Sequence, residues 1–141
     1  MIIGGGPGGY EAALVAAQLG GRVTVVEEKG IGGSAVLTDV VPSKSLIATA
    51  DVMTKVRTSS RLGIRPVDPQ FDSLLQAATI DWDMLNARLI DLAVQQSTDI
   101  RKRLESEGIR CLAGRGRLDG TREVVATHAD GSEERLRADF I

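Results

Sequence analysis

The opening stretch of the chain, up to Glu28, has a hydrophobic pattern that predicts a βαβ unit. The apolar run Met1–Ile3 leads directly into a glycine-rich turn, Gly4–Gly9. Alanine and leucine residues then recur at helical spacing as far as Leu19, and the β-branched run Val23–Val26 follows. A strand, a glycine turn, a helix and a second strand in this order are typical of a parallel sheet with a crossover helix.

Helical patterns dominate the middle of the chain. Ser34 to Ser60 is predicted to be mostly helical, whereas Phe71 to Thr79 fits either a short helix or an irregular connection. A long helix is predicted from Asp81, a good N-cap, to about Glu107, with Gly108 as its C-cap. Its apolar residues at helical spacing are Trp82, Leu85, Leu89, Leu92, Ile100 and Leu104. We expect this stripe to pack on a sheet or on another helix.

The end of the chain is rich in short β patterns. The predicted strands are Ile109–Ala113, Arg115–Leu118, Glu123–His128 and Arg135–Ile141. Asp119-Gly120 and Asp130-Gly131 are hairpin signals between them. The chain is therefore predicted to be an α/β protein with a Rossmann-like parallel sheet, a long helix and a small antiparallel β-meander. The short first strand and the abrupt last one suggest a fold that is incomplete at both ends, that is, the first part of a longer protein.

The glycines of the first turn have the spacing of a dinucleotide-binding site. Gly4 permits a tight turn, Gly6 lets a pyrophosphate approach the backbone, and Gly9 lets the helix pack close to the sheet. Glu27 closes the second strand, where an acidic side chain can accept hydrogen bonds from a ribose. A glycine turn without a ligand is the alternative, but the strand, helix and acidic residue in their expected places favour a dinucleotide. The motif alone does not distinguish NAD from FAD.

A second glycine-rich loop, Lys29 to Gly33, follows directly. It can bring backbone N–H groups to the same ligand, or it can be a flexible connection. The sequence favours neither alternative.

Composition limits the classes of function. The 141 residues are 43% hydrophobic and 26% charged, as in an ordinary globular domain, and with only 3% aromatic residues the core must be aliphatic. A net charge of −2 argues against a nucleic-acid partner. No apolar run is long enough to cross a membrane, no signal peptide is recognisable, and the single cysteine, Cys111, allows no internal disulfide. These features predict a cytoplasmic protein.

Several ordered motifs resemble those of the flavoprotein disulfide reductases, and dihydrolipoamide dehydrogenase in particular. Ile3–Ala13 is similar to the FAD fingerprint of that family. Gly32–Ser34 and Val41–Lys44 resemble its redox-helix segment, and Gly114–Gly116 resembles a later glycine pair on the adenine side of FAD. The resemblance covers the whole chain and implies an N-terminal FAD-binding portion, with the NAD(P)-binding and dimerisation domains outside residues 1–141.

The resemblance implies FAD as the bound dinucleotide and assigns residues to it. Gly4, Gly6 and Gly9 would cradle the pyrophosphate, and Lys44 would place a positive charge near the flavin ring, where it stabilises the reduced form. Without the family context, Lys44 is simply a solvated lysine early in a helix. The complete set of expected cofactor-binding residues is Gly4, Gly6, Pro7, Gly9, Glu27, Gly33, Ser34, Lys44 and Gly116.

The chain departs from that family where the redox disulfide should be. Ala35 and Val40 stand at the positions of the two redox cysteines, and neither can form a thiolate or a disulfide. Cys111 has no partner cysteine, and His128 lies in a strand-like run with no catalytic constellation around it. A disulfide reductase mechanism is therefore excluded, and no catalytic residue is expected within this chain.

The resemblance still implies flavin chemistry, but without a redox disulfide. The chain resembles a cysteine-less branch, the NAD(P)H:quinone reductases of actinobacteria. The expected function is hydride transfer from NAD(P)H to FAD and on to a quinone-type small-molecule acceptor, in a full-length homodimer. The residues 1–141 alone are expected to be inactive. The alternatives are a protein related to dihydrolipoamide dehydrogenase that has lost the redox cysteines, and a flavin-binding module without turnover.

Overall fold

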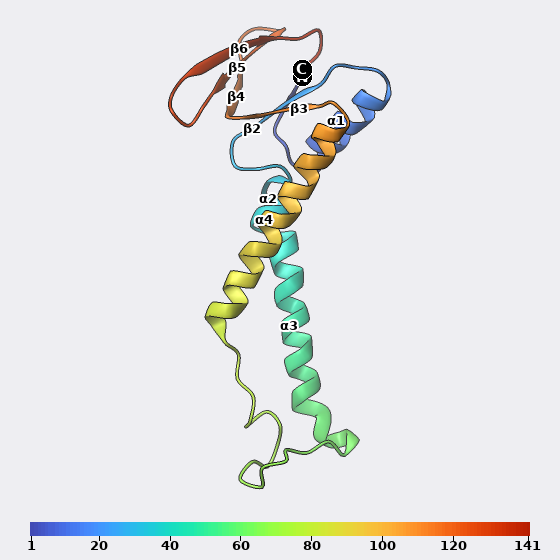
Figure 1. Ribbon diagram of the computed structural model, residues 1–141, viewed down its shortest axis with the longest axis vertical. Coiled ribbons are helices and arrows are strands. Elements are labelled where there is room, and N and C mark those ends of the chain that lie inside the picture. The colour runs from blue at the N-terminus through green and yellow to red at the C-terminus, as the bar shows by residue number, and fades with distance from the viewer.

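The computed structural model describes residues 1–141 and contains two three-stranded sheets and four α-helices (Figure 1). In chain order the elements are β1 (Ile2–Ile3), α1 (Pro7–Gln18), β2 (Thr24–Glu27), α2 (Gly33–Leu37), α3 (Val40–Thr58), the 3₁₀-helix η1 (Ser59–Leu62), α4 (Trp82–Ser106), β3 (Arg110–Ala113), β4 (Arg115–Leu118), β5 (Glu123–Thr127) and β6 (Glu133–Arg137). The predicted α/β class is confirmed.

The first sheet is parallel, with strand order β1-β2-β3. Ile2 lies opposite Val25, and Val25 lies opposite Cys111. Helix α1 connects β1 to β2, so the predicted βαβ unit is present. Because all three strands run the same way, their carboxyl ends meet at one edge of the sheet, which is where ligands bind in open α/β sheets.

The second sheet is the predicted antiparallel meander, in the order β4-β5-β6. Only Gly114 separates β3 from β4, so the meander lies directly beside the parallel sheet. At Gly116 a Cβ atom would lie 3.0 Å from Ile3 Cγ2 and 3.3 Å from Val26 Cγ1. Gly116 therefore lets the two sheets approach each other closely.

The core is aliphatic, as the composition predicts. One cluster of buried side chains joins α1, β2 and the end of α4; its members are Ala13, Val23, Val25, Ile31, Leu104 and Ile109. A smaller cluster lies between the two sheets and contains Val26, Val124 and Ala126. We call the two sheets, α1 and the C-terminal end of α4 the head.

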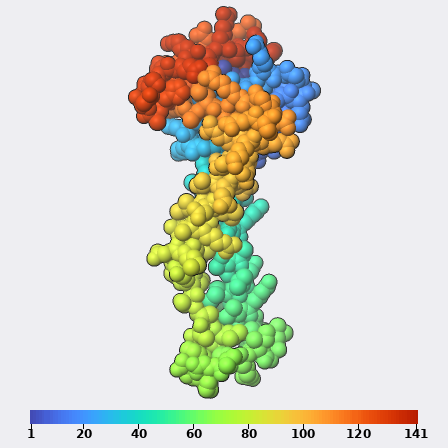
Figure 2. Space-filling model, in the orientation of Figure 1, coloured from blue at the N-terminus to red at the C-terminus, as the bar shows by residue number.

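Helices α3 and α4 extend away from the head (Figure 1). Together with η1 and residues 63–81 they form a narrower projection, which we call the arm (Figure 2). Large apolar side chains of the arm are exposed: Ile47 is 60% exposed, Trp82 66% and Leu62 81%. No helix of the structure combines the length and the apolar character needed to cross a bilayer.

The predicted helical stretch from Ser34 to Ser60 is interrupted. Helix α2 ends at Leu37, where the N–H groups of Thr38 and Asp39 both donate to the carbonyl of Ser34, and α3 begins at Val40. Pro42 explains the break, because a proline inside a continuous helix has no N–H and clashes with the carbonyl four residues earlier. In the first turn of α3 neither problem arises.

The long helix is confirmed at both ends. The side chain of Asp81 accepts a hydrogen bond from the N–H of Met84 at 2.9 Å, and Gly108 has φ +76° just beyond the last turn. The predicted packing of its apolar stripe holds only in part. Leu104 is fully buried in the head and Leu85 is buried near the N-terminal end of the helix, whereas Trp82 is 66% exposed and Leu92 38% exposed.

Two further predictions are refined. The last strand runs from Glu133 to Arg137, not from Arg135 to Ile141, because its partner β5 ends opposite these residues: Thr127 pairs with Glu133 and Glu123 with Arg137. Residues 71–79 form turns and no helix, so the irregular alternative holds there.

Candidate functional site: two glycine loops at the end of the parallel sheet

The first glycine loop turns sharply from β1 into α1. Gly4 has φ +99°, a conformation that side chains rarely adopt. A Cβ atom at Gly9 would lie 2.0 Å from the carbonyl oxygen of Gly4, so only glycine lets α1 begin this close to the end of β1. A Cβ atom at Gly6 would meet nothing within 4 Å, which leaves the surface beside this residue open to a ligand.

The N-terminus of α1 presents backbone donors without partners. Gly6 is the N-cap, no side chain caps the helix, and Pro7 follows at the first helical position. The first N–H group of the helix with a partner is that of Tyr10, which donates to the carbonyl of Gly6 at 3.0 Å. The N–H groups of Gly6, Gly8 and Gly9 remain available at the positive end of the helix dipole. This arrangement favours an anionic group such as a pyrophosphate.

Glu27, at the end of β2, ties the loops to each other. One carboxylate oxygen accepts from the N–H of Gly5 at 2.7 Å, and the other accepts from the N–H of Lys29 at 2.7 Å. A carboxylate offers about four acceptor positions, so Glu27 keeps capacity for further donors such as ribose hydroxyl groups. The predicted ribose-binding acid therefore also holds the two glycine loops in place.

The second glycine loop packs against the first. The N–H of Gly32 donates to the carbonyl of Gly5 at 2.7 Å. A Cβ atom at Gly33 would lie 3.1 Å from the Cα of Gly6, and Gly33 has φ +57°. These contacts favour the interpretation in which the second loop borders the same ligand as the first. We call the two loops together with Glu27 the cradle.

The structure brings most of the predicted site residues together, but not all of them. Gly4, Gly6, Pro7, Gly9, Glu27 and Gly33 belong to the cradle, and Ser34 follows it as an exposed residue in the first turn of α2. Lys44 lies in α3, exposed and without a hydrogen bond or ion pair. Gly116 packs against Ile3 and Val26 and has a purely structural explanation in this conformation.

A pocket of about 440 Å³ lies between the ends of β2 and β3 and the meander, and sequence reasoning did not identify it. Its lining residues are Glu28, Ala113, Gly114, Arg115, Thr127, His128 and Ala129. Gly114 belongs to this lining, whereas Gly116 does not. A Cβ atom at Gly114 would lie 2.8 Å from the carbonyl oxygen of Thr127, and the Gly114 N–H donates to the carbonyl of Glu27 at 2.9 Å. The only signal in the sequence was the Gly114–Gly116 pair, which did not show which glycine faces the pocket.

The two positions at which the resemblance expects redox cysteines carry no sulfur. Ala35 lies in α2 and Val40 begins α3, on the two sides of the helix break. Cys111 is in β3, packs at the edge of the main core cluster, and is the one cysteine of the chain. Burial raises the pKa of its thiol, and the nearby Glu105 carboxylate adds to this effect, so the reactive thiolate is disfavoured.

The fold and the cradle define a Rossmann-like nucleotide-binding unit, and comparison with known proteins identifies its family. The profile of the pyridine nucleotide-disulphide oxidoreductases matches residues 1–141. The chain belongs to this family, which confirms the resemblance seen in the sequence motifs.

Individual relatives agree with this assignment. An NAD(P)H dehydrogenase (quinone) of Mycobacterium tuberculosis is 44% identical over 150 residues, covering 100% of this chain and 29% of the relative. A dihydrolipoyl dehydrogenase of Zymomonas mobilis is 30% identical over 138 residues, covering 98% of this chain and 28% of the relative. The crystal structure of LpdA from Mycobacterium tuberculosis matches with a TM-score of 0.82 and 41% identity, covering 98% of this chain and 29% of that chain. The chain thus spans under a third of the length of these relatives.

Proposed function

We propose that residues 1–141 form the FAD-binding portion of an NAD(P)H-dependent flavoprotein oxidoreductase that acts on a quinone-type acceptor without a redox disulfide. The observation that carries this proposal is the combination of a glycine cradle, open beside Gly6, with Ala35 and Val40 at the positions expected for the two cysteines.

The cradle fits the phosphates and the ribose of FAD. The N–H groups of Gly6, Gly8 and Gly9 have no protein partner, and no Cβ atom at Gly6 blocks the approach of a pyrophosphate. Glu27 stands at the end of the next strand, in reach of the neighbouring ribose. Gly33 lies against Gly6, so the second loop borders the same phosphates.

Residues outside the cradle complete the assignment. Ser34 would border the pyrophosphate and the flavin, and Lys44 would supply a positive charge near the flavin ring. Gly114, at the wall of the neighbouring pocket, joins Gly116 as a candidate on the adenosine side.

Flavin chemistry and the name of one relative both support a quinone as the electron acceptor. When bound, FAD supplies hydride acceptance from NAD(P)H and electron delivery to an acceptor. The residues of this chain bind and orient it, and they contain no thiol pair that could relay electrons onward. A relative at 44% identity is named NAD(P)H dehydrogenase (quinone), which supports a quinone as the acceptor.

The rest of the activity is assigned to the full-length protein. By analogy with relatives more than three times as long, the NAD(P)-binding and dimerisation domains would lie outside residues 1–141, in a cytoplasmic homodimer. Residues 1–141 alone are expected to be inactive.

The experiment is a comparison of acceptors after the thiols of the full-length protein have been alkylated. We expect NAD(P)H oxidation with a quinone to continue at the rate of the untreated protein, and turnover of lipoamide to be negligible. Lipoamide turnover comparable to quinone turnover would favour a dihydrolipoamide dehydrogenase. Failure of NADH or NADPH to bleach the flavin absorbance would favour a binding module without turnover.

A further inference from the structure

The order of the parallel strands gives a direction to a bound dinucleotide. In the proposed function, the pyrophosphate lies at the end of β1, where the first glycine loop begins, and a ribose lies at the end of β2, beside Glu27. Because the strand order is β1-β2-β3, the next position along the sheet edge is the end of β3, at Ala113. The pocket of about 440 Å³ opens at this position, between Glu28 and Ala113. A base that is attached to that ribose and continues in the direction of the meander would reach this pocket.

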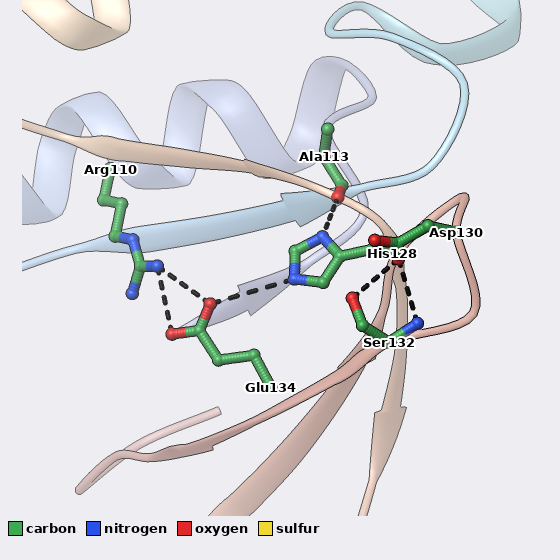
Figure 3. Close-up of polar contacts among 6 residues, drawn as sticks. All are labelled: Arg110, Ala113, His128, Asp130, Ser132 and Glu134. Atoms are coloured by element: carbon green, nitrogen blue, oxygen red, sulfur yellow. Dashed lines mark hydrogen bonds and ion pairs between the residues drawn. The ribbon is translucent and has the colours of Figure 1, made fainter.

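His128, the single histidine of the chain, lies on the wall of this pocket and is oriented by a hydrogen bond (Figure 3). Its Nδ1 atom lies 2.9 Å from the carbonyl oxygen of Ala113. A carbonyl oxygen only accepts hydrogen bonds, so Nδ1 carries the proton and donates it. The bond joins the end of β5 to the end of β3, and both residues line the pocket.

The opposite edge of the ring faces an ion pair outside the pocket lining. His128 Nε2 lies 4.0 Å from Glu134 Oε2, and Arg110 donates to both carboxylate oxygens of Glu134 at 3.0 and 2.9 Å. At this distance, and with the proton on Nδ1, Glu134 makes no hydrogen bond to the ring, so the hydrogen bond to Ala113 is the contact that orients His128 (Figure 3).

We infer that His128 is a positioning residue for the adenine base of the bound FAD. Its hydrogen bond to Ala113 keeps the imidazole ring still, and the immobile ring forms part of the wall against which the base packs. A pre-fixed wall improves affinity because less side-chain freedom is lost when the ligand binds. This inference rests on the proposed function, since it requires FAD in the cradle.

The test compares FAD dissociation constants of full-length variants, measured by titrating FAD into the apoprotein. We expect His128→Ala to weaken FAD binding about 5- to 10-fold, the range that one lost hydrogen bond and its ordered ring can account for. His128→Asn keeps an N–H that can donate to the Ala113 carbonyl, and we expect it to recover part of the loss. Glu134→Gln is the matched control, because it breaks the ion pair with Arg110 but does not line the pocket; its FAD affinity should stay within about twofold of the unmodified protein.

Each outcome bears on the inference separately from the proposed function. Unchanged FAD affinity in His128→Ala overturns the inference alone. An equal loss in Glu134→Gln also overturns it, because the effect would then come from general weakening of the meander. If His128→Asn binds FAD as weakly as His128→Ala, the role assigned to the Ala113 hydrogen bond is wrong. An unmodified protein that binds no FAD at all overturns the proposed function and this inference with it.

Discussion

The head and the arm use the same aliphatic residue types but bury them to very different extents. The large side chains that are fully buried, among them Val25 and Leu104, all lie in the head, whereas in the arm Leu85 is the one large apolar side chain that is buried, and Ile47 and Leu62 are 60% and 81% exposed. Burial of a leucine-sized side chain contributes about 1.5–3 kcal/mol, so most of the stabilisation within these residues comes from the head. The cradle connects β1, α1 and β2, and all three elements belong to the head. The well-packed part of the molecule therefore holds the backbone of the cradle in place.

The sharpest test of this comparison uses two positions on the same helix. Leu104→Ala removes a fully buried side chain of α4 in the head, and we expect it to lower the free energy of unfolding by about 3–4 kcal/mol. Ile90→Ala, on the same helix where the side chain is 55% exposed, should cost less than about 1 kcal/mol. Denaturant unfolding measures both. Equal losses would show that the arm is as tightly packed as the head.

The next prediction concerns the close contact that lets α1 begin at the end of β1. Gly9→Ala places a Cβ atom 2.0 Å from the carbonyl of Gly4, and we expect a loss of about 2–3 kcal/mol together with loss of FAD binding. The matched control is Gly8→Ala, one residue earlier, whose Cβ atom would meet nothing within 4 Å. The control should leave the unfolding free energy of the apoprotein nearly unchanged. A tolerated Gly9→Ala would mean that the loop is not shaped by this contact.

A smaller effect is expected at the start of α4, where the arm depends on local interactions. Asp81→Ala removes the acceptor for the Met84 N–H and should cost about 1 kcal/mol. Asp83→Ala changes a neighbouring acidic residue of the first turn that does not cap the helix, so it should cost a few tenths of a kcal/mol. Circular dichroism during thermal unfolding compares the two variants. A larger loss in Asp83→Ala would contradict the capping role.

The smallest effect is a pH dependence at the tip of the β5–β6 hairpin. Hydrogen bonds from the Ser132 side chain and backbone lower the pKa of Asp130 below its ordinary value of 3.8. A lowered pKa means that the stabilisation is present above about pH 4 and is lost as the pH falls through the folded-state pKa. Asp130→Asn should therefore unfold with a slightly weaker dependence of the melting temperature on pH between pH 5 and about pH 3. If the melting temperature of the variant depends on pH in the same way as that of the unmodified protein, Asp130 does not contribute to the pH dependence of stability.

The sequence predicted the elements of the head well because local and long-range signals agree there. The glycine spacing from Gly4 to Gly9, the run Val23–Val26 and the Asp-Gly turns each specify one local geometry. The helix break before Val40 was missed because the helical pattern continues across it, and the break comes from Pro42, whose ring would meet the carbonyl four residues earlier in a continuous helix. The exposure of Trp82 was missed for another reason: helical periodicity shows that a face is apolar, but not whether a partner lies opposite it.

The site was predictable only where a motif dictates backbone geometry. The positions of Gly6, Gly9 and Glu27 follow from a spacing that has a physical reason at each residue. The pocket beside Gly114 and His128 depends on how the meander lies against the parallel sheet, and no local pattern encodes that placement. For the same reason His128 carried no signal in the sequence, although its ring is fixed by the carbonyl of Ala113.

The most direct test of the central claim is the FAD content of the purified full-length protein, measured from its visible absorbance. The account predicts a yellow protein with an equimolar amount of FAD, and a Gly9→Ala variant that is colourless. A full-length protein that is isolated without colour and stays colourless after incubation with FAD would contradict the account.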